Sequence, residues 1–215
     1  MLFRTLIFVN LTWLLSATVV LDRVAIIVGR RVVKTSDIER DLRASQFVNG
    51  EPVNVSMEAK RKVADRLIVQ ELVRQETMNG GYSQPNERDV DALLQPQHRD
   101  AAALTRYSLT AEQLRRYLLW QLTVLRFIDE RFRPGVLVTD EDVRDYYEKH
   151  RRELEKAYPK SNSLEALTPK IREIISGELV NQRFEEWIEE TKRRTRIEYR
   201  DAAFGGTAPS REVAR

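Results

Sequence analysis

Acidic side chains stand next to one another at two places in the 215-residue chain, and positioned carboxylates can carry out general acid–base catalysis. The two groups are Asp140-Glu141-Asp142 and Glu189-Glu190. Both fall in the end turns of segments that are expected to be helical. For the first group, the helix dipole and N-terminal capping account for the charges. We therefore expect these carboxylates to be structural, and we predict no catalytic residue.

Histidine and cysteine give no indication of a metal or nucleophile site. The chain has no cysteine, which excludes disulfides, thiol catalysis and thiolate metal ligands. Its two histidines, His98 and His150, are far apart in the sequence and neither belongs to an acidic-His motif. There is also no glycine-rich phosphate loop and no nucleophile elbow. We expect ordinary surface histidines, no metal and no cofactor.

The composition is typical of a helical protein with a thin core and an elongated shape. Hydrophobic residues make up 42% of the chain and charged residues 32%, with a formal net charge of +3. Nucleic-acid binders concentrate their basic residues on one face with aromatic residues between them. Here the basic residues are interleaved with Asp and Glu. We expect no nucleic-acid partner.

The N-terminus has the layout of an export signal. Arg4 precedes a largely apolar run from Thr5 to Leu21, which only Asn10 and a few hydroxyl residues interrupt. This layout is typical of a secretory signal peptide. The small residues Ser16, Ala17 and Thr18 make only a mediocre cleavage site, so residues 1–21 are either a signal peptide or a retained N-terminal membrane anchor. In both cases the remainder is expected to work outside the cytoplasm.

Two strand-like segments lie at opposite ends of the region that follows. Residues 24–33 (VAIIVGRRVV) predict a β-hairpin with a type II′ turn at Gly29-Arg30. A lone hairpin is not stable in water, and the other strand-like segment is 195–200 (TRIEYR). We predict that this strand completes a small sheet with the hairpin. The residues between the strands are predicted to form helices over about 36–47, 56–78, 85–94, 98–107, 110–131, 139–154 and 164 or 169 to 194. Two of these helices begin with capping boxes, Ser36/Glu39 and Thr110/Gln113.

Segment 111–132 carries two apolar stripes when it is drawn as a helix. The broad one consists of Leu114, Leu118, Leu122, Leu125, Ile128 and Phe132. Trp120 and Phe127 form a second stripe outside it. Either another helix of the same chain covers this second stripe, or it is a binding surface, because exposed aromatic patches mark interaction sites.

The last helix has two opposed apolar faces. Ile171, Ile174 and Ile175 make the first, and Val180, Phe184, Trp187 and Ile188 make the second, about half a turn round, with Gly177 at the change. One straight helix with two such faces needs different neighbours at its two ends. We therefore predict an extended cradle in which this helix bridges two lobes.

Four strings in this order resemble the SurA-like periplasmic chaperones: VAIIVGRRVVKTSDIERDL, YSLTAEQLRRYLLWQLTVLRFIDERF, VTDEDVRDYYEKHRREL and IREIISGELVNQRFEEWIEETKRRTRIEYR. Isomerase members of that family insert a parvulin domain between the third and fourth strings. Here only about ten residues separate Leu154 from Leu164, too few for a domain. The resemblance therefore implies a mainly α chaperone domain over residues 22–200, with a hairpin completed by the C-terminal strand and without the isomerase.

The expected function is an extracytoplasmic, ATP-independent holdase for unfolded envelope or outer-membrane proteins. The client-binding residues that we predict are Leu119, Trp120, Phe127, Tyr146 and Tyr147. Two alternatives stay open: a prolyl isomerase-family protein with residual or no activity, and a specific envelope assembly partner, in which the second stripe docks one protein or completes a homodimer. The N-terminus can serve as a membrane tether. Residues 201–215 are expected to be a disordered tail.

Overall fold

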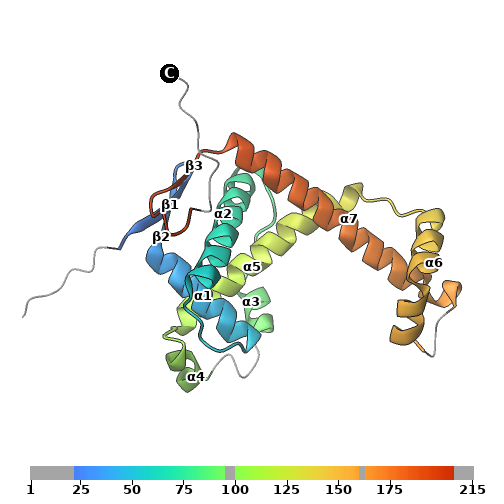
Figure 1. Cartoon of the computed structure of the whole chain (residues 1–215), viewed down its shortest axis with the longest axis horizontal. Coiled ribbons are helices and arrows are strands. Elements are labelled where there is room, and N and C mark those ends of the chain that lie inside the picture. The colour runs from blue at the N-terminus through green and yellow to red at the C-terminus, as the bar shows by residue number, and fades with distance from the viewer. Residues whose placement is uncertain (1–21, 95–99, 160–162, 206–215) are drawn as a thin grey trace, which may run out of the picture.

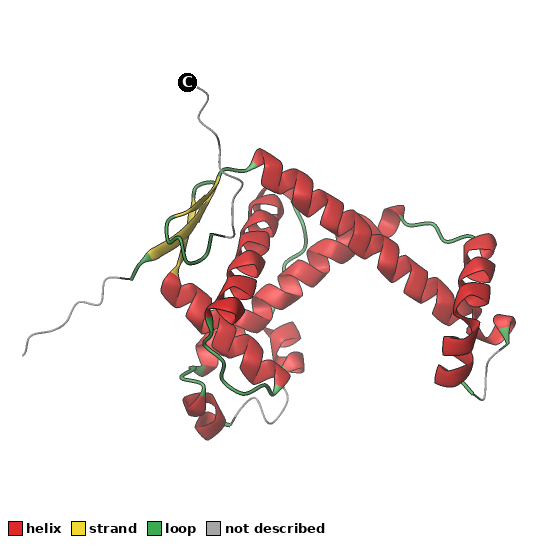
Figure 2. Cartoon of the chain, in the orientation of Figure 1, coloured by secondary structure: helices red, strands yellow, loops and turns green. Residues whose placement is uncertain are grey.

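The computed structural model describes residues 22–94, 100–159 and 163–205. This part of the chain is mainly α-helical with one small sheet (Figure 2). The predicted export signal, residues 1–21, lies outside the described residues. The strands are β1 (Val24–Val28), β2 (Arg31–Lys34) and β3 (Ile197–Tyr199), and the helices are α1 (Thr35–Asn49), α2 (Met57–Gly80), α3 (Glu87–Leu93), α4 (Ala101–Arg106), α5 (Ala111–Phe132), α6 (Asp140–Ala157) and α7 (Leu164–Arg194), with a 3-10 turn at Arg133–Gly135.

The sheet joins the two ends of the described chain, as the sequence predicted. Its strand order is β2-β1-β3, and both pairings are antiparallel. Ile27 lies opposite Val32 on one side and Glu198 on the other. Gly29 has φ +60° and Arg30 has no positive φ, which fits the predicted type II′ turn. The two-residue loop therefore needs glycine at its first position.

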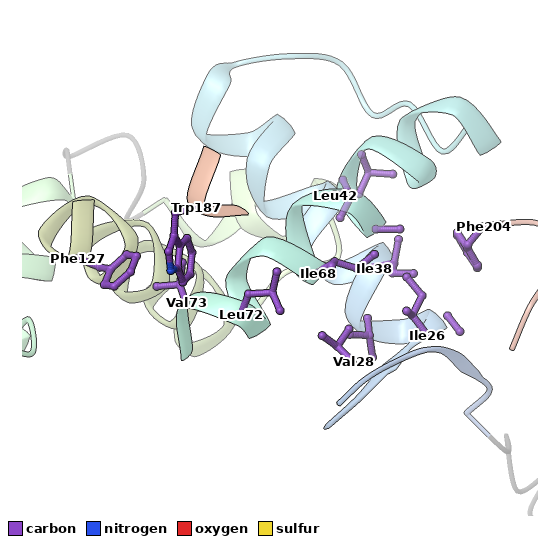
Figure 3. Packing of buried hydrophobic residues seen from close by; sticks show 14 of the residues in the cluster. Ile26, Val28, Ile38, Leu42, Ile68, Leu72, Val73, Phe127, Trp187 and Phe204 are labelled. Carbon is purple, nitrogen blue, oxygen red and sulfur yellow. The ribbon is translucent and has the colours of Figure 1, made fainter. Parts of the chain in front are cut away.

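The main hydrophobic core lies between the sheet, α1, α2, α5 and the second half of α7 (Figure 3). β1 turns Ile26 and Val28 towards α2, which contributes Ile68, Leu72 and Val73. α5 and α7 add an aromatic group at the other end of the same core. A second cluster joins α1, α3, α4 and the first half of α5. We call this part of the molecule, including α7 beyond Gly177, the body.

α6 and α7 up to Gly177 form a separate arm. Figure 1 shows α7 running from the sheet out of the body to pack against α6. The arm has its own small core of Val143, Leu154, Leu167 and Ile171. Beyond Gly177 the apolar side chains of α7, including Val180 and Trp187, belong to the core of the body. The prediction of one helix that bridges two lobes is confirmed.

Most helix starts follow their predicted caps. Ser56, Thr110 and Thr139 accept the expected backbone N–H bonds at the starts of α2, α5 and α6. The predicted cap of α1 is wrong: its first turn closes through the Lys34 backbone N–H, which donates to Asp37 at 3.0 Å, while the Ser36 hydroxyl donates to Asp22. α3 begins two residues after Pro85, with Asn86 as its cap.

The expected disorder from residue 201 onward is wrong for the first five residues. Residues 201–205 form a turn in which the Phe204 N–H donates to the Asp201 carbonyl at 3.0 Å. The Phe204 side chain is 4% exposed and packs into the main core. Residues 206–215 lie outside the described residues.

No helix within the described ranges is both long and apolar enough to cross a membrane.

Candidate functional site

The five predicted client-binding residues lie in three different environments. Leu119 and Trp120 lie in the N-terminal half of α5, and Phe127, also on α5, lies in the core of the body. Tyr146 and Tyr147 lie in the arm, where both are half-buried against its core. The fold therefore does not bring the five side chains together at one site.

Phe127 is a core residue, and its predicted role as an exposed contact is wrong. Its side chain is 1% exposed. The ring of Trp187 on α7 lies 5.0 Å from it, and those of Tyr82 and Phe132 lie 5.1 and 5.7 Å from it, centroid to centroid. Edge-on and tilted aromatic pairs at these distances are favourable. The second stripe of α5 is thus covered at this end by α7 of the same chain (Figure 3).

Trp120, one heptad earlier, is only half-buried and borders a cavity. The Arg74 guanidinium lies over its ring, with Cζ 3.8 Å from the ring centroid. Such a cation–π contact fixes both side chains. Leu119 beside it is 37% exposed and does not line the cavity.

The cavity has a volume of about 330 Å³ and lies between β2, α1, α2 and α5. We call it the β2 groove. Its apolar walls come from Val32, Val33, Leu67, Tyr117 and Trp120, and Gln70 also lines it. The remaining lining residues are Ala44, Gln113 and seven charged residues: Arg31, Asp37, Arg40, Asp41, Glu71, Arg74 and Arg116.

Two guanidinium groups share one carboxylate in this groove. Nε of Arg31 donates to Oε1 of Glu71 at 3.2 Å. Nε of Arg74 lies 3.1 Å from the same oxygen, but it is not aligned for a hydrogen bond and is buried without a hydrogen-bond partner. Burial lowers the pKa of Arg74, as does the charge of Arg31, while Glu71 opposes the shift. The groove therefore holds a positive charge that its own residues do not balance.

The second ion pair of the groove is complete. Nε of Arg66 donates to Oδ2 of Asp41 at 3.1 Å, and Cζ of Arg66 lies 5.8 Å from the centre of the Tyr117 ring. Burial raises the pKa of Asp41, and the charge of Arg66 opposes that rise. Burial also raises the pKa of Tyr117. Asp41 and Arg66 thus satisfy each other and leave Arg31 and Arg74 as the groove's open cations.

The arm carries a smaller cavity of about 270 Å³ beside Tyr146. His150 stacks on Tyr146 with a centroid distance of 4.3 Å, and its Nδ1 lies 2.8 Å from Oε2 of Glu153. His150 also has non-helical dihedral angles, which bend α6 at this point. The ring stack thus supports a local bend. Across the three described ranges, no group of three or more His, Asp or Glu side chains is placed to hold a metal ion.

One residue in the sequence, Glu71, could have indicated the groove, although the hydrophobic periodicity of the helices did not. Glu71 stands directly before Leu72 and Val73 in the middle of α2, and it is 8% exposed. A carboxylate at a buried position needs a partner. Arg74, three residues later, is a partner that the sequence could indicate. The other partner, Arg31, comes from β2, and nothing in the sequence pairs it with α2.

The β2 groove combines cations, an aromatic wall and a strand edge, which are features that can bind a ligand. Neither the models of known protein families nor the curated proteins give a match to this chain.

Proposed function

We propose that the protein is an ATP-independent chaperone that holds unfolded envelope or outer-membrane polypeptides outside the cytoplasm. The observation that carries the proposal is the arrangement of a body and an arm, each with its own core, along the bridging helix α7. Such a shape presents a long surface to an extended chain. The resemblance to SurA-like chaperones and the apolar N-terminus support the family and the location.

The surface of this arrangement carries apolar side chains without a covering element. Leu125 on α5 is 57% exposed, and Leu137, between the body and the arm, is 81% exposed. Met78 at the end of α2 is 79% exposed. One large exposed patch would mark a defined interaction site, whereas we infer that these separate side chains make weak and reversible contacts with many sequences.

Holding would work by mass action. A protein that binds the unfolded state lowers the free concentration of that state, and aggregation falls steeply with this concentration. No nucleotide is needed, because each client is released whenever the equilibrium favours its folding. Near-stoichiometric amounts of the chaperone are then required.

The test is an aggregation assay with the purified protein and two unrelated, chemically denatured clients that are diluted into buffer without ATP. We expect light scattering to fall for both clients as the molar ratio approaches one. Protection of neither client, or of only one, would contradict the proposal, and protection of only one would favour a specific assembly partner. A proline isomerisation assay on a short peptide tests the isomerase alternative, for which we expect no acceleration.

Leu119 and Leu93 give a matched pair for the same assay. Leu119 is 37% exposed beside the groove and Leu93, on α3, is 40% exposed. Leu119→Ser and Leu93→Ser remove similar apolar surface from different places. We expect Leu119→Ser to weaken protection of both clients more than Leu93→Ser does, and equal effects would exclude a role for this part of α5.

A further inference from the structure

The floor of the β2 groove has an incomplete set of charges. Arg31 and Arg74 approach the same carboxylate oxygen of Glu71. Arg74 Nε is buried without a hydrogen-bond partner, and Arg31 donates to Glu71 through its Nε alone. Arginine binds carboxylates through two parallel N–H bonds, so both side chains have N–H donors available for a further carboxylate.

The other charges of the groove are paired, which places the imbalance at this point. Four arginines line the groove against three carboxylates. Asp37 pairs with Arg40, and Asp41 pairs with Arg66 from outside the lining. Arg116 on the rim pairs with Glu112 at 3.6 Å. One further carboxylate would balance Arg31 and Arg74.

β2 brings a second feature to the same place, because it is an edge strand of the sheet. Val33 is buried on the side that faces the helices, whereas Val32 points to the opposite side and is 49% exposed. Both residues line the groove. Because residues from both faces of β2 line the cavity, it opens at the edge of that strand. There the backbone groups of Val32 are available to pair with another chain, whereas the N–H of Lys34 already donates to Asp37.

We propose that the β2 groove binds an acidic, extended polypeptide segment that adds to the edge of β2 as a fourth strand and places a Glu or Asp carboxylate between Arg31 and Arg74. The backbone pairing would be independent of sequence, and the carboxylate would set the preference. Trp120 and Tyr117 would contact the apolar stem of the bound side chain. This proposal deepens the chaperone function above and rests on it, since it names the class of segment that the protein holds.

The occupant is a polypeptide because the open cations and the free strand edge share one cavity. A small anion would use the guanidinium groups alone and would gain nothing from β2. A second copy of this chain is disfavoured, because antiparallel pairing of β2 with itself about Val32, whose backbone groups face away from β1, sets Arg30 opposite Lys34. Like charges directly opposite each other destabilise a strand pair.

The first experiment measures fluorescence anisotropy of labelled ten-residue peptides with alternating Thr and Val, blocked at both ends. The peptides differ only at one central position, which is Glu, Gln or Lys. A charge-assisted contact is stronger than a neutral one, so we expect the Glu peptide to bind about tenfold more tightly than the Gln peptide and the Lys peptide to bind more weakly still. A Gln peptide with a free C-terminal carboxylate shows whether a chain end is the source instead.

Variants of the groove then test the residues. Arg31→Gln should weaken binding of the Glu peptide about tenfold and leave the Gln peptide unchanged, whereas Arg30→Gln, at the adjacent turn position, should change neither. Glu71→Gln removes the competing carboxylate and should strengthen binding of the Glu peptide. Thermal unfolding shows whether each variant is folded. If Glu71→Gln is not folded, the comparison of Arg31→Gln with Arg30→Gln tests the proposal.

The backbone part of the proposal has its own probe. In a strand added to β2, alternate N–H groups point towards β2. Two versions of the Glu peptide are compared, one N-methylated at the odd positions and one at the even positions. Methylation of one set, or phase, should abolish binding, and methylation of the other should preserve it. Equal effects in the two phases would overturn strand addition, as would an anion-only site that binds free glutarate as tightly as the Glu peptide.

The outcomes separate this inference from the chaperone function. Equal binding of Glu and Gln peptides, or equal effects of the two arginine variants, overturns the inference even if aggregation of both clients is suppressed. Absence of all peptide binding also overturns it. Selective Glu binding without any suppression of aggregation would preserve the groove and overturn the holdase.

Discussion

Phe127 on α5 is 1% exposed, and four other aromatic rings surround it, those of Tyr82, Phe132, Phe184 and Trp187. Phe127→Ala removes this ring and leaves a cavity that the rigid helices around it cannot fill. We expect the free energy of unfolding to fall by about 3–5 kcal/mol. Urea denaturation followed by circular dichroism measures the change.

The control for this substitution is Leu125→Ala, two residues earlier on the same helix, where the side chain is 57% exposed. Surface substitutions usually change stability by no more than about 0.5 kcal/mol. If the two variants lost similar stability, the packing of α5 against α7 would be incorrect.

Asp142 titrates as part of the cap of α6. Hydrogen bonds from Thr139, first from its side chain and then from its backbone N–H, lower the pKa of Asp142 below the ordinary 3.8. Thr139→Val keeps the shape and removes the hydroxyl donor. We expect the pKa of Asp142 to rise towards 3.8 in this variant, which an NMR titration of the carboxyl carbon measures.

The same shift fixes the direction of a pH effect on stability. Because the pKa is lower in the folded protein, ionised Asp142 stabilises the fold above pH 3.8, and this contribution is lost as the pH falls through the folded pKa. The difference in stability between the protein and its Asp142→Asn variant should therefore shrink on acidification below pH 3.8. A constant difference would exclude the carboxylate as the stabilising group.

The fates of Trp120 and Phe127 illustrate what a residue pattern can predict. The 3.6-residue period placed both on one stripe of α5, and the structure keeps them there. The period says nothing about which stripe another element covers, however. α7 covers Phe127 from far along the sequence, whereas Arg74 of α2 covers Trp120 with a charge, so one residue became core and the other became a groove wall.

At the scale of single elements, two glycines have opposite roles. Gly177 is inside α7, and a Cβ there would meet no atom within 4 Å, whereas Gly29 has φ +60° at the hairpin turn. Gly177→Ala should stabilise the protein by roughly 0.5–1 kcal/mol, because glycine loses more backbone entropy in a helix. Gly29→Ala should destabilise it by roughly 1–2 kcal/mol, because it forces a left-handed conformation. Thermal and urea unfolding measure both.

The two substitutions add the same methyl group, so their opposite signs control for the change in composition. A loss of stability in Gly177→Ala would mean that α7 is not a continuous helix at the change of faces. No loss in Gly29→Ala would mean that the turn of the hairpin has a different conformation.

Helix starts could be predicted where a side chain and its partner three residues later form a reciprocal pair. Thr110 with Gln113 is such a pair, and it was found from the sequence. At α1 the predicted pair of Ser36 with Glu39 does not form: the Ser36 hydroxyl bonds to Asp22, and the helix begins at Thr35. Asp22 comes from the other side of the hairpin, and local sequence could not indicate that contact.

At the scale of the whole molecule, the described residues form an arm and a body with separate cores, which α7 and the segment from the 3-10 turn at Arg133–Gly135 to α6 connect. Ile171 is fully buried in the arm. Ile171→Ala should cost about 2–5 kcal/mol within the arm, and such local losses appear as sub-global opening. Hydrogen exchange followed by mass spectrometry should show faster exchange in α6, with α2 unchanged.

Val180→Ala is the counterpart on the other side of Gly177, since Val180 is buried in the core of the body. We expect it to accelerate exchange in the body helices. If either variant accelerated exchange equally throughout, the two lobes would be one cooperative unit, and an independent arm would be excluded.

The two-lobed plan could be predicted because α7 shows both of its faces in its own sequence. The β2 groove could not be predicted, because four elements contribute to it and no stretch of the sequence contains more than part of its wall. The sheet stands between these cases: each strand was visible by its composition, and their pairing followed because a hairpin alone would not be stable.

β1 has its second partner about 170 positions further along the polypeptide. During synthesis, the first strand therefore leaves the ribosome long before the segment that flanks it in the finished molecule exists. Such a long loop closure is slow, and it delays the last step of folding until translation of the described region is almost complete. Until then, the nascent chain keeps its own apolar strand edge exposed, and for that interval it is itself in need of protection.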